Sequence, residues 1–156
     1  MRRNRPEKRI VQPDLRYSSL QVQTVIHHVL KRGKKSTATK LVYEMMDLLG
    51  ERTGKDPLEV FETALTKASP RMEVRPKRVG GATYQVPMDV TPERRLALAI
   101  RWILASARSR KGQPFSGALA AEFLDAYNET GAAIRKRDET HKMAEANRAF
   151  SHYRGA

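Results

Sequence analysis

The chain has 156 residues, with 30 Lys and Arg against 17 Asp and Glu, a formal net charge of +13, and no cysteine. That length suffices for one domain with a sizeable core, and the lack of cysteine excludes disulfides and thiolate metal sites. No apolar run could span a bilayer, and the start lacks the apolar segment of a signal peptide, so we expect a cytoplasmic protein with no membrane segment. The excess charge predicts a polyanionic partner, with nucleic acid the first interpretation and an acidic membrane surface the second.

The two signs of charge are unevenly distributed along the chain. Residues 15–43, 74–88 and 94–121 contain no Asp or Glu. The acids gather instead in one central region, at Glu44, Asp47, Glu51, Asp56, Glu59 and Glu62. Solvated surfaces usually mix both signs, so the acid-free windows indicate a face held against phosphate, with chance clustering as the alternative.

Residues 1–10 are expected to form a flexible basic arm. Its cations are Arg2, Arg3, Arg5, Lys8 and Arg9. With no apolar residue before Ile10 except Met1, the arm should be disordered alone and become ordered on a polyanion; a solubilising tail is the alternative. Residues 11–156 are expected to form a single helical domain, which includes a β-ribbon at 71–90 and binds the polyanionic partner.

Two helices are predicted next, with a cation cluster between them. Ser18 or Ser19 can cap a first helix that ends at Gly33. Its apolar stripe comprises Val22, Val25, Ile26, Val29 and Leu30. Ser36 is the expected cap of the second helix, which stops near Gly54 and buries Ala38, Leu41, Val42, Met45, Leu48 and Leu49. The cluster in the intervening turn consists of Lys31, Arg32, Lys34 and Lys35.

A third helix and a fourth helix begin with a cap followed by proline, at Asp56-Pro57 and Thr91-Pro92. Phe61, Leu65 and Ala68 should face inward from the third helix. Leu96, Ile100, Ile103 and Ala107 should do so from the fourth. On the fourth helix Arg94, Arg101 and Arg108 recur every seven residues, which places them on one exposed face with Arg95 close by. We expect at least two of the three to contact phosphate.

The remaining helices are less sharply defined by the sequence. A fifth helix, about residues 116–128, should bury Leu119, Phe123, Leu124 and Tyr127 and end at Gly131. The last segment, residues 132–153, has a helical composition but a weak apolar stripe. A long polar helix of this kind usually leans on a partner for part of its stability.

Residues 71–90 should form a β-ribbon around Gly80-Gly81, because glycine enters positive φ at little steric cost. A two-residue loop would place Glu73 beside Met88 and Arg75 beside Val86, a mixed face. We favour a three-residue loop that pairs Val79 with Thr83. Its inner face would then carry Met72, Val74, Pro76, Tyr84, Val86, Met88 and Val90. Its outer face would carry Arg71, Arg75, Lys77, Thr83 and Gln85.

The architecture expected from these elements is mainly α, a bundle of about six helices with a protruding two-stranded antiparallel ribbon between the third and fourth. Prolines at positions 76 and 87 remove ladder donors, which suits an isolated ribbon. A lone ribbon is marginal in water, so one face should rest on helices. Its basic face is then available for a partner.

Catalytic chemistry has little support in the sequence. Adjacent His27 and His28 point about 100° apart on a helix, and we find no metal-ligand spacing between His141 or His152 and a carboxylate. No motif for a nucleophile or for a phosphate-cradling loop is present, so we expect no catalytic residues, metal or cofactor. Trp102 fits either base stacking or a core edge, and Tyr84 fits either base stacking or cross-strand packing.

Three motifs in order resemble the bacterial small-subunit ribosomal protein seven family. PRMEVRPKRVGGATYQVPMDVTPERR, at 70–95, resembles its central signature. Tyr17-Ser18-Ser19 followed by GKKSTATKLVY, at 33–43, resembles the amino-terminal one, and MAEANRAFSHYR, at 143–154, the closing one. The resemblance covers nearly the whole chain, with one departure at Met45, where the family has a small residue.

The resemblance implies a six-helix fold with a ribbon between the third and fourth helices, and a structural role in the ribosome. It implies direct, early binding to small-subunit ribosomal RNA that nucleates assembly of the head, and a place at the subunit interface near the exit-site transfer RNA. The RNA-contacting regions carried over are the basic arm, Lys34-Lys35, and Arg75, Lys77, Arg78, Arg94, Arg95 and Arg101.

Further contacts are implied at two places. The ribbon tip, with Arg78, Gly80, Gly81 and Tyr84, approaches transfer RNA in this family. Ribosomal proteins nine and eleven are the expected neighbours, and protein eleven would meet Arg148, Phe150, His152, Tyr153 and Arg154.

Two other classes of function remain alternatives. An architectural DNA-binding protein would also use a basic β-arm, although such arms often carry an apolar or proline wedge at the tip, where this chain has Gly-Gly-Ala. A nuclease would need clustered acids or histidines, which the sequence does not supply. Folded RNA, recognised by shape and phosphate, fits the dispersed cations best.

Overall fold

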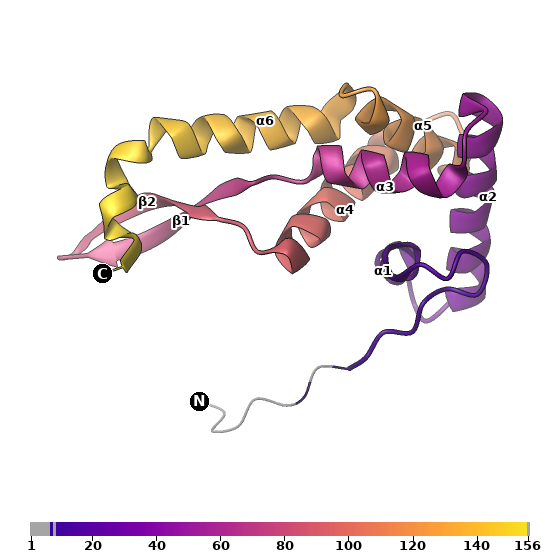
Figure 1. The fold of residues 1–156 in the computed structure, drawn as a ribbon, viewed down its shortest axis with the longest axis horizontal. Helices are drawn as coiled ribbons and strands as arrows, with labels where there is room; N and C mark the ends of the chain where they lie inside the picture. The colour runs from indigo at the N-terminus through magenta and orange to yellow at the C-terminus, as the bar shows by residue number, and fades with distance from the viewer. Residues whose placement is uncertain (1–6, 8, 156) are drawn as a thin grey trace.

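A bundle of helices with a long protruding ribbon makes up the computed structural model, which describes residues 7 and 9–155, the side chains of 154 and 155 excepted. Figure 1 shows the ribbon extending from one end of the bundle, with the last helices running alongside it. The elements in chain order are α1 (Leu20–Val29), α2 (Lys35–Thr53), α3 (Pro57–Ala68), β1 (Met72–Val79), β2 (Ala82–Asp89), α4 (Pro92–Ser109), α5 (Phe115–Tyr127), α6 (Gly131–Ala146) and the 3₁₀-helix η1 (Arg148–Gly155). The expected architecture is therefore confirmed.

Most predicted helix ends are right to within a residue or two. Ser19 caps α1, with its hydroxyl accepting from the Val22 amide. Asp56 caps α3 and Gly54 ends α2 in the left-handed region. Ser36 was wrong as a cap because α2 already begins at Lys35.

Two glycines were assigned the wrong role as helix terminators. Helix α1 ends at Val29, four residues before Gly33, which belongs to the following turn. Gly131 opens α6 instead of closing α5, which ends at Tyr127. In each case the chain leaves the helix earlier, and the positive φ of the glycine shapes the connection that follows.

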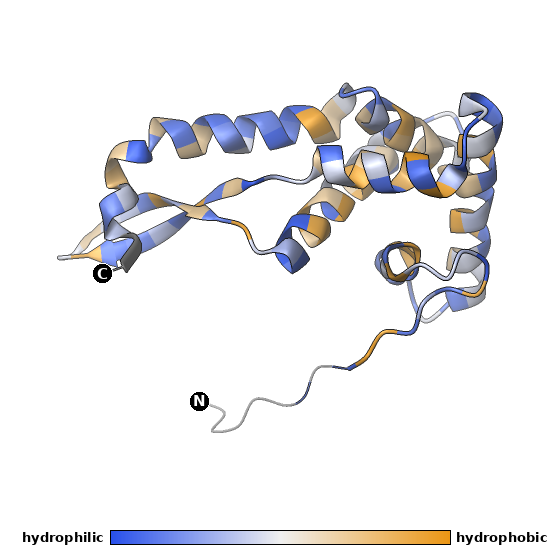
Figure 2. Ribbon diagram, in the orientation of Figure 1, coloured by the Kyte–Doolittle hydropathy of each residue, from blue (hydrophilic) through white to orange (hydrophobic). Residues whose placement is uncertain are grey.

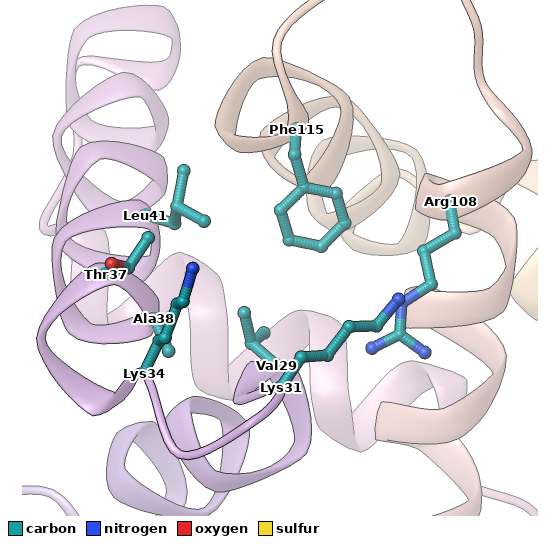
Figure 3. Close-up of a pocket in the computed structure, with 8 residues that line it drawn as sticks. All are labelled: Val29, Lys31, Lys34, Thr37, Ala38, Leu41, Arg108 and Phe115. Atoms are coloured by element: carbon teal, nitrogen blue, oxygen red, sulfur yellow. The ribbon is translucent and has the colours of Figure 1, made fainter.

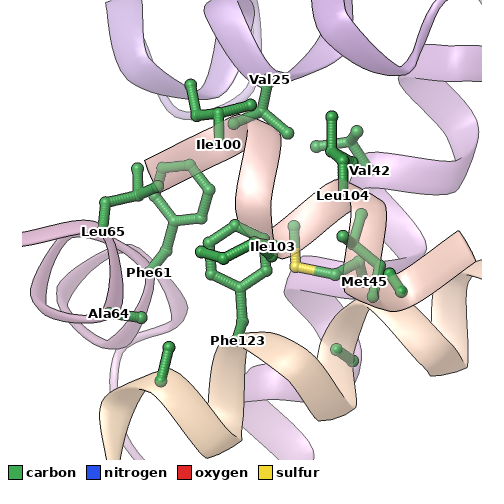
Figure 4. Close-up of a cluster of buried hydrophobic side chains, with 14 of the residues drawn as sticks. Val25, Val42, Met45, Phe61, Ala64, Leu65, Ile100, Ile103, Leu104 and Phe123 are labelled. Carbon is green, nitrogen blue, oxygen red and sulfur yellow. The ribbon is translucent and has the colours of Figure 1, made fainter. Parts of the chain in front are cut away.

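The core lies where α5 packs against α2, α3 and α4. Phe61 and Phe123 stack with ring centroids 5.0 Å apart, and Ile103 lies beside them (Figure 4). Met45 is fully buried in this cluster, so the core accommodates a large side chain at the position where the resemblance implied a small one. Figure 2 shows the hydrophobic residues concentrated between these helices and hydrophilic ones along most of α6.

Predicted inward positions are confirmed where the helix has neighbours on that side. Phe61, Leu65 and Ala68 of α3 are all buried. Six other predicted apolar positions are only partly buried: Leu30, Leu41, Leu48, Leu96, Leu124 and Tyr127. All of them except Leu41 pack against the buried core cluster.

The ribbon register differs from the one favoured by the sequence. Val79 pairs with Ala82, so the loop is the two residues Gly80-Gly81, and both have positive φ as a primed hairpin turn requires. Arg75 lies opposite Val86 and Glu73 opposite Met88, which is the mixed face of the two-residue register. The mixed face is stable because Glu73 is not an isolated charge: two arginines pair with it.

Candidate nucleic-acid interface

Helix α4 carries the predicted arginine face. Arg94, Arg101 and Arg108 are all exposed, while Ile100, Ile103 and Ala107 on the other side are buried. Seven residues are close to two helical turns, which is why the three side chains share one face. Arg95 is half-buried, and its Nε donates to the carbonyl of Val90 at 2.9 Å. Trp102 is half-buried and packs against the core. This agrees with its interpretation as a residue at the core edge.

At its carboxyl end this face meets the cation cluster of the α1–α2 turn. Lys31, Lys34 and Arg108 line a pocket of about 230 Å³ whose wall includes the Phe115 ring. Figure 3 shows the Lys31 side chain reaching toward Arg108, with Phe115 pointing into the space between them. Arg108 Nη2 also donates to the carbonyl of His28 at 3.3 Å, which ties α4 to the end of α1. Two groups of cations that are distant in sequence thus form one surface.

The turn holds its cations outward because of its backbone. Arg32 and Gly33 both adopt left-handed φ values, 52° and 75°. Two such residues in succession reverse the chain sharply between α1 and α2. Lys31, Arg32, Lys34 and Lys35 are all exposed as a result.

At the amino end of α4 the arginine face meets the ribbon. Glu73 on β1 is buried, its side chain only 8% exposed. Arg94 Nε lies 2.7 Å from its Oε1, and Arg75 Nη2 lies 2.6 Å from the same atom. Arg75 and Arg94, both predicted RNA contacts, are therefore also part of the joint between ribbon and helix.

Other ribbon residues divide between exposure and internal contacts. Arg78, opposite Thr83 near the tip, is exposed, as are Gly80 and Gly81. Lys77 is half-buried, and its Nζ donates to the carbonyl of Tyr153 at 2.9 Å. The predicted outward position of Lys77 was wrong, because the two-residue register places it opposite Tyr84 beneath η1.

Tyr84 belongs to an aromatic cluster formed with η1. Its ring lies 5.0 Å from that of Tyr153 and 5.3 Å from that of Phe150. Of the two interpretations of Tyr84, packing is therefore the one that the structure supports, although the ring packs against η1 and not across the strands. Arg148 and His152 remain exposed on η1, and Arg148 pairs with Glu145 at 3.2 Å.

The start of the ribbon is anchored on α6. The backbone N–H of Arg71 donates to His141 Nε2 at 2.9 Å, so this ring nitrogen must be unprotonated. Burial is the main cause that lowers the pKa of His141, with a further contribution from nearby Arg137. Arg71 itself has an exposed side chain.

Apart from Arg75 and Arg94, which pair with Glu73, many of the candidate RNA cations differ from the structural cations in their ion pairs. Among the described residues, no carboxylate pairs with Lys31, Arg32, Lys34, Lys35, Arg71, Arg78, Arg95, Arg101 or Arg108. Arg16, Lys67, Arg110 and Arg137, none of them predicted RNA contacts, do have such partners. The hydrogen bond from Arg110 to buried Glu122 raises the pKa of this arginine and secures the end of α4 to α5.

Sequence reasoning missed three buried acids that join parts of the fold. Two are Glu73 and Glu122, described above. The third is Asp14, whose carboxylate accepts from the amides of Tyr17 and Ser19 and from the Tyr43 hydroxyl, which fixes the chain before α1 onto α2. Burial of a carboxylate depends on donors from distant parts of the chain, and no local pattern reveals them.

Some of the predicted RNA-binding and protein-contact residues lie outside the part of the chain that the structure describes. Arg2, Arg3, Arg5, Lys8 and the side chain of Arg154 are not described, while Arg9 is exposed. Within residues 7 and 9–155, no cluster of three or more potential metal-binding side chains occurs. None of the helices in that part of the chain is long and apolar enough to cross a membrane.

Comparison with known proteins gives the surface a context. Residues 1–148 match the family described as ribosomal protein S7p/S5e. Small ribosomal subunit protein uS7 of Thermomicrobium roseum is 57% identical over 153 residues, which cover 98% of each chain. The proteins of the same name from Chloroflexus aurantiacus and Prochlorococcus marinus are 56% and 54% identical, over 97% and 98% of each chain.

The chain belongs to the ribosomal protein S7 family. The resemblance drawn from its three motifs is thus confirmed. As an S7 family member it is a structural constituent of the small ribosomal subunit, where it binds ribosomal RNA, and it is not an enzyme. The architectural DNA-binding protein and the nuclease are thereby set aside.

Proposed function

We propose that this chain binds small-subunit ribosomal RNA directly and early, and nucleates assembly of the head of the small subunit in the cytoplasm. The observation that carries the proposal is the path of cations along α4. Arg94 contacts the ribbon at one end of the helix, and Arg108 contacts the α1–α2 region at the other. One rigid element therefore joins two basic regions that are separate in the sequence.

A surface of this shape suits a folded RNA better than a single extended strand. Its cations project from a helix, a turn and a ribbon, so their relative positions are set by the fold. Folded RNA is recognised largely through its shape and backbone, which such a fixed array can match. The arm carrying Arg2, Arg3, Arg5, Lys8 and Arg9 would add contacts beyond this rigid surface.

Exit-site transfer RNA and two neighbouring proteins complete the proposal. The exposed tip, with Arg78, Gly80 and Gly81, is suited to approach transfer RNA. Tyr84 would support the tip through η1 and not touch transfer RNA itself, because its ring packs on Tyr153. Ribosomal protein eleven would contact the exposed residues of η1, and protein nine is the other expected neighbour.

The test is a salt titration of binding to small-subunit ribosomal RNA. Replacing Arg101 and Arg108 by Gln should reduce the slope of log K against log salt by about one to two units, because each phosphate contact contributes roughly 0.7 to 0.9. Arg94 is left intact, since it also holds Glu73. Helix content should not change, because both side chains are exposed.

Two comparisons make the result specific. Arg52 and Lys136 are exposed on α2 and α6. Replacing both by Gln removes the same charge as the Arg101 and Arg108 variant and should leave the slope of log K against log salt nearly unchanged. Duplex DNA at the same salt should compete less well than folded ribosomal RNA. An unaltered slope for the Arg101 and Arg108 variant would refute the proposed interface.

A further inference from the structure

An acidic residue lies buried within the basic surface. Glu73 is on β1, and the ribbon from residue 74 to residue 88 contains no other acid. Its side chain is 8% exposed, against 46% for Arg75 and 43% for Arg94. A buried carboxylate is costly unless it is paired and hydrogen-bonded, so this position has to be explained by its partners.

Both partners bind Glu73 through part of their hydrogen-bonding capacity. Arg75 donates from Nε at 2.7 Å and lies 2.6 Å away through Nη2. Arg94 donates from Nε to both carboxylate oxygens, at 2.7 and 2.9 Å. A guanidinium group has five N–H donors, so each arginine keeps donors for a further acceptor, above all the terminal nitrogens of Arg94.

The carboxylate brings together two like charges that would otherwise separate. Arg75 comes from the ribbon and Arg94 from α4, and without a shared anion their guanidinium groups would repel each other. Glu73 holds both within hydrogen-bonding distance of one group while nearly half of each side chain stays open to solvent. Paired guanidinium groups with free donors match the geometry of a phosphate.

We propose that Glu73 is a positioning residue for RNA binding, which holds Arg75 and Arg94 as a preformed clamp for one backbone phosphate of the folded RNA. This inference rests on the proposed function. The arginines bind the phosphate, and Glu73 acts only through them. The same contact fixes the base of the ribbon on α4, so the ribbon is oriented before RNA arrives.

Charge alone and the clamp predict opposite effects on RNA affinity when Glu73 is replaced. Removing a negative charge from a surface that faces phosphate should tighten RNA binding. If Glu73 positions the clamp, its loss should weaken binding, because two long side chains must then be ordered by the RNA itself. The sign of the effect therefore separates the two accounts.

The experiment is binding of the full chain to small-subunit ribosomal RNA at fixed salt, comparing Glu73→Gln with Glu51→Gln. Glu51 is exposed on α2, so its variant carries the same charge change away from the clamp. We expect Glu73→Gln to bind roughly tenfold more weakly, from the cost of immobilising two arginine side chains. Glu51→Gln should bind as tightly as the native chain or slightly more tightly.

A second background distinguishes positioning from a general loss of structure. In a chain that already carries Arg75→Gln and Arg94→Gln, replacing Glu73 should cause no further loss of affinity, because no clamp remains to be positioned. Binding by Glu73→Gln that equals or exceeds native binding would overturn the inference. An equal loss in both backgrounds would overturn it as well.

If Glu73→Gln does not fold, the two arginine variants alone decide the matter. Arg75→Gln and Arg94→Gln should each lose most of the phosphate contact, so the double variant should cost less than the sum of the two. Full additivity would refute a shared phosphate. Failure of the Arg101 and Arg108 test would remove the proposed interface, whereas failure here with that test passed would remove only the role of Glu73.

Discussion

Replacing Arg75 by Gln should lower thermal stability as well as RNA affinity. An outward-facing Arg75 would affect binding alone, as the three-residue register requires. In the structure Arg75 lies opposite Val86 and pairs with a buried carboxylate, so its loss removes two contacts within 2.7 Å of Glu73. Among the described residues, Arg94 is then the one cation that still pairs with Glu73.

The size of the effect follows from the exposure of the two groups. A hydrogen bond to a charged group contributes about 1.5 to 3 kcal/mol. Arg75 is 46% exposed, and solvent screening weakens such pairs, so we expect a loss of about 1 kcal/mol. For a domain of this size that corresponds to a fall in melting temperature of roughly 2 to 4 °C.

The matched control is Arg78→Gln, a change of the same charge on the same strand. Arg78 is exposed near the tip, and none of the described carboxylates pairs with it. Thermal melts followed by circular dichroism should show a lower melting temperature for the Arg75 variant and an unchanged one for the Arg78 variant. Equal melting temperatures in the native chain and both variants would refute the role of Arg75 in the joint.

Two further predictions concern the ribbon and its anchor. Val86→Ala removes two methyl groups from a residue that is 1% exposed and should lower the free energy of unfolding by about 2 kcal/mol. Val79 is half-buried beside the turn, so Val79→Ala should lower it clearly less in a denaturant titration. Equal losses in the two variants would contradict the packing described. Because the pKa of His141 is lowered in the folded state, chiefly by burial, the unfolded state takes up a proton first, and this residue should cost stability as pH falls through about 6.5. His141→Gln should reduce the loss of melting temperature between pH 7.5 and 5.5, and an unchanged difference would show that the contact with Arg71 does not respond to pH.

The helices could be predicted because their signals are local. The cap and proline at Asp56-Pro57 and the spacing of Phe61, Leu65 and Ala68 lie within a few turns of one another, and all were confirmed. The exposed face formed by Arg94, Arg101 and Arg108 follows from helical periodicity in the same way. Whether those side chains contact RNA stays a prediction.

The ribbon register could not be predicted, because it depends on a distant residue. An inward-facing acid at position 73 looks unfavourable from the ribbon sequence alone, and one of the two arginines that pair with it, Arg94, comes 21 residues later. The meeting of Lys31 and Lys34 with Arg108 likewise depends on how α4 crosses the end of α1. Local patterns identified the cations in both regions but not their neighbours.

The packing of η1 on the ribbon has a consequence for the order in which parts of the protein fold during synthesis. Lys77 and the carbonyl that it contacts, on Tyr153, are 76 residues apart in the chain. At a synthesis rate of 5 to 20 residues per second, roughly 4 to 15 s pass before the second partner is made. During that interval the ring of Tyr84 lacks both aromatic neighbours, so a nascent ribbon should be the last part of the molecule to become ordered.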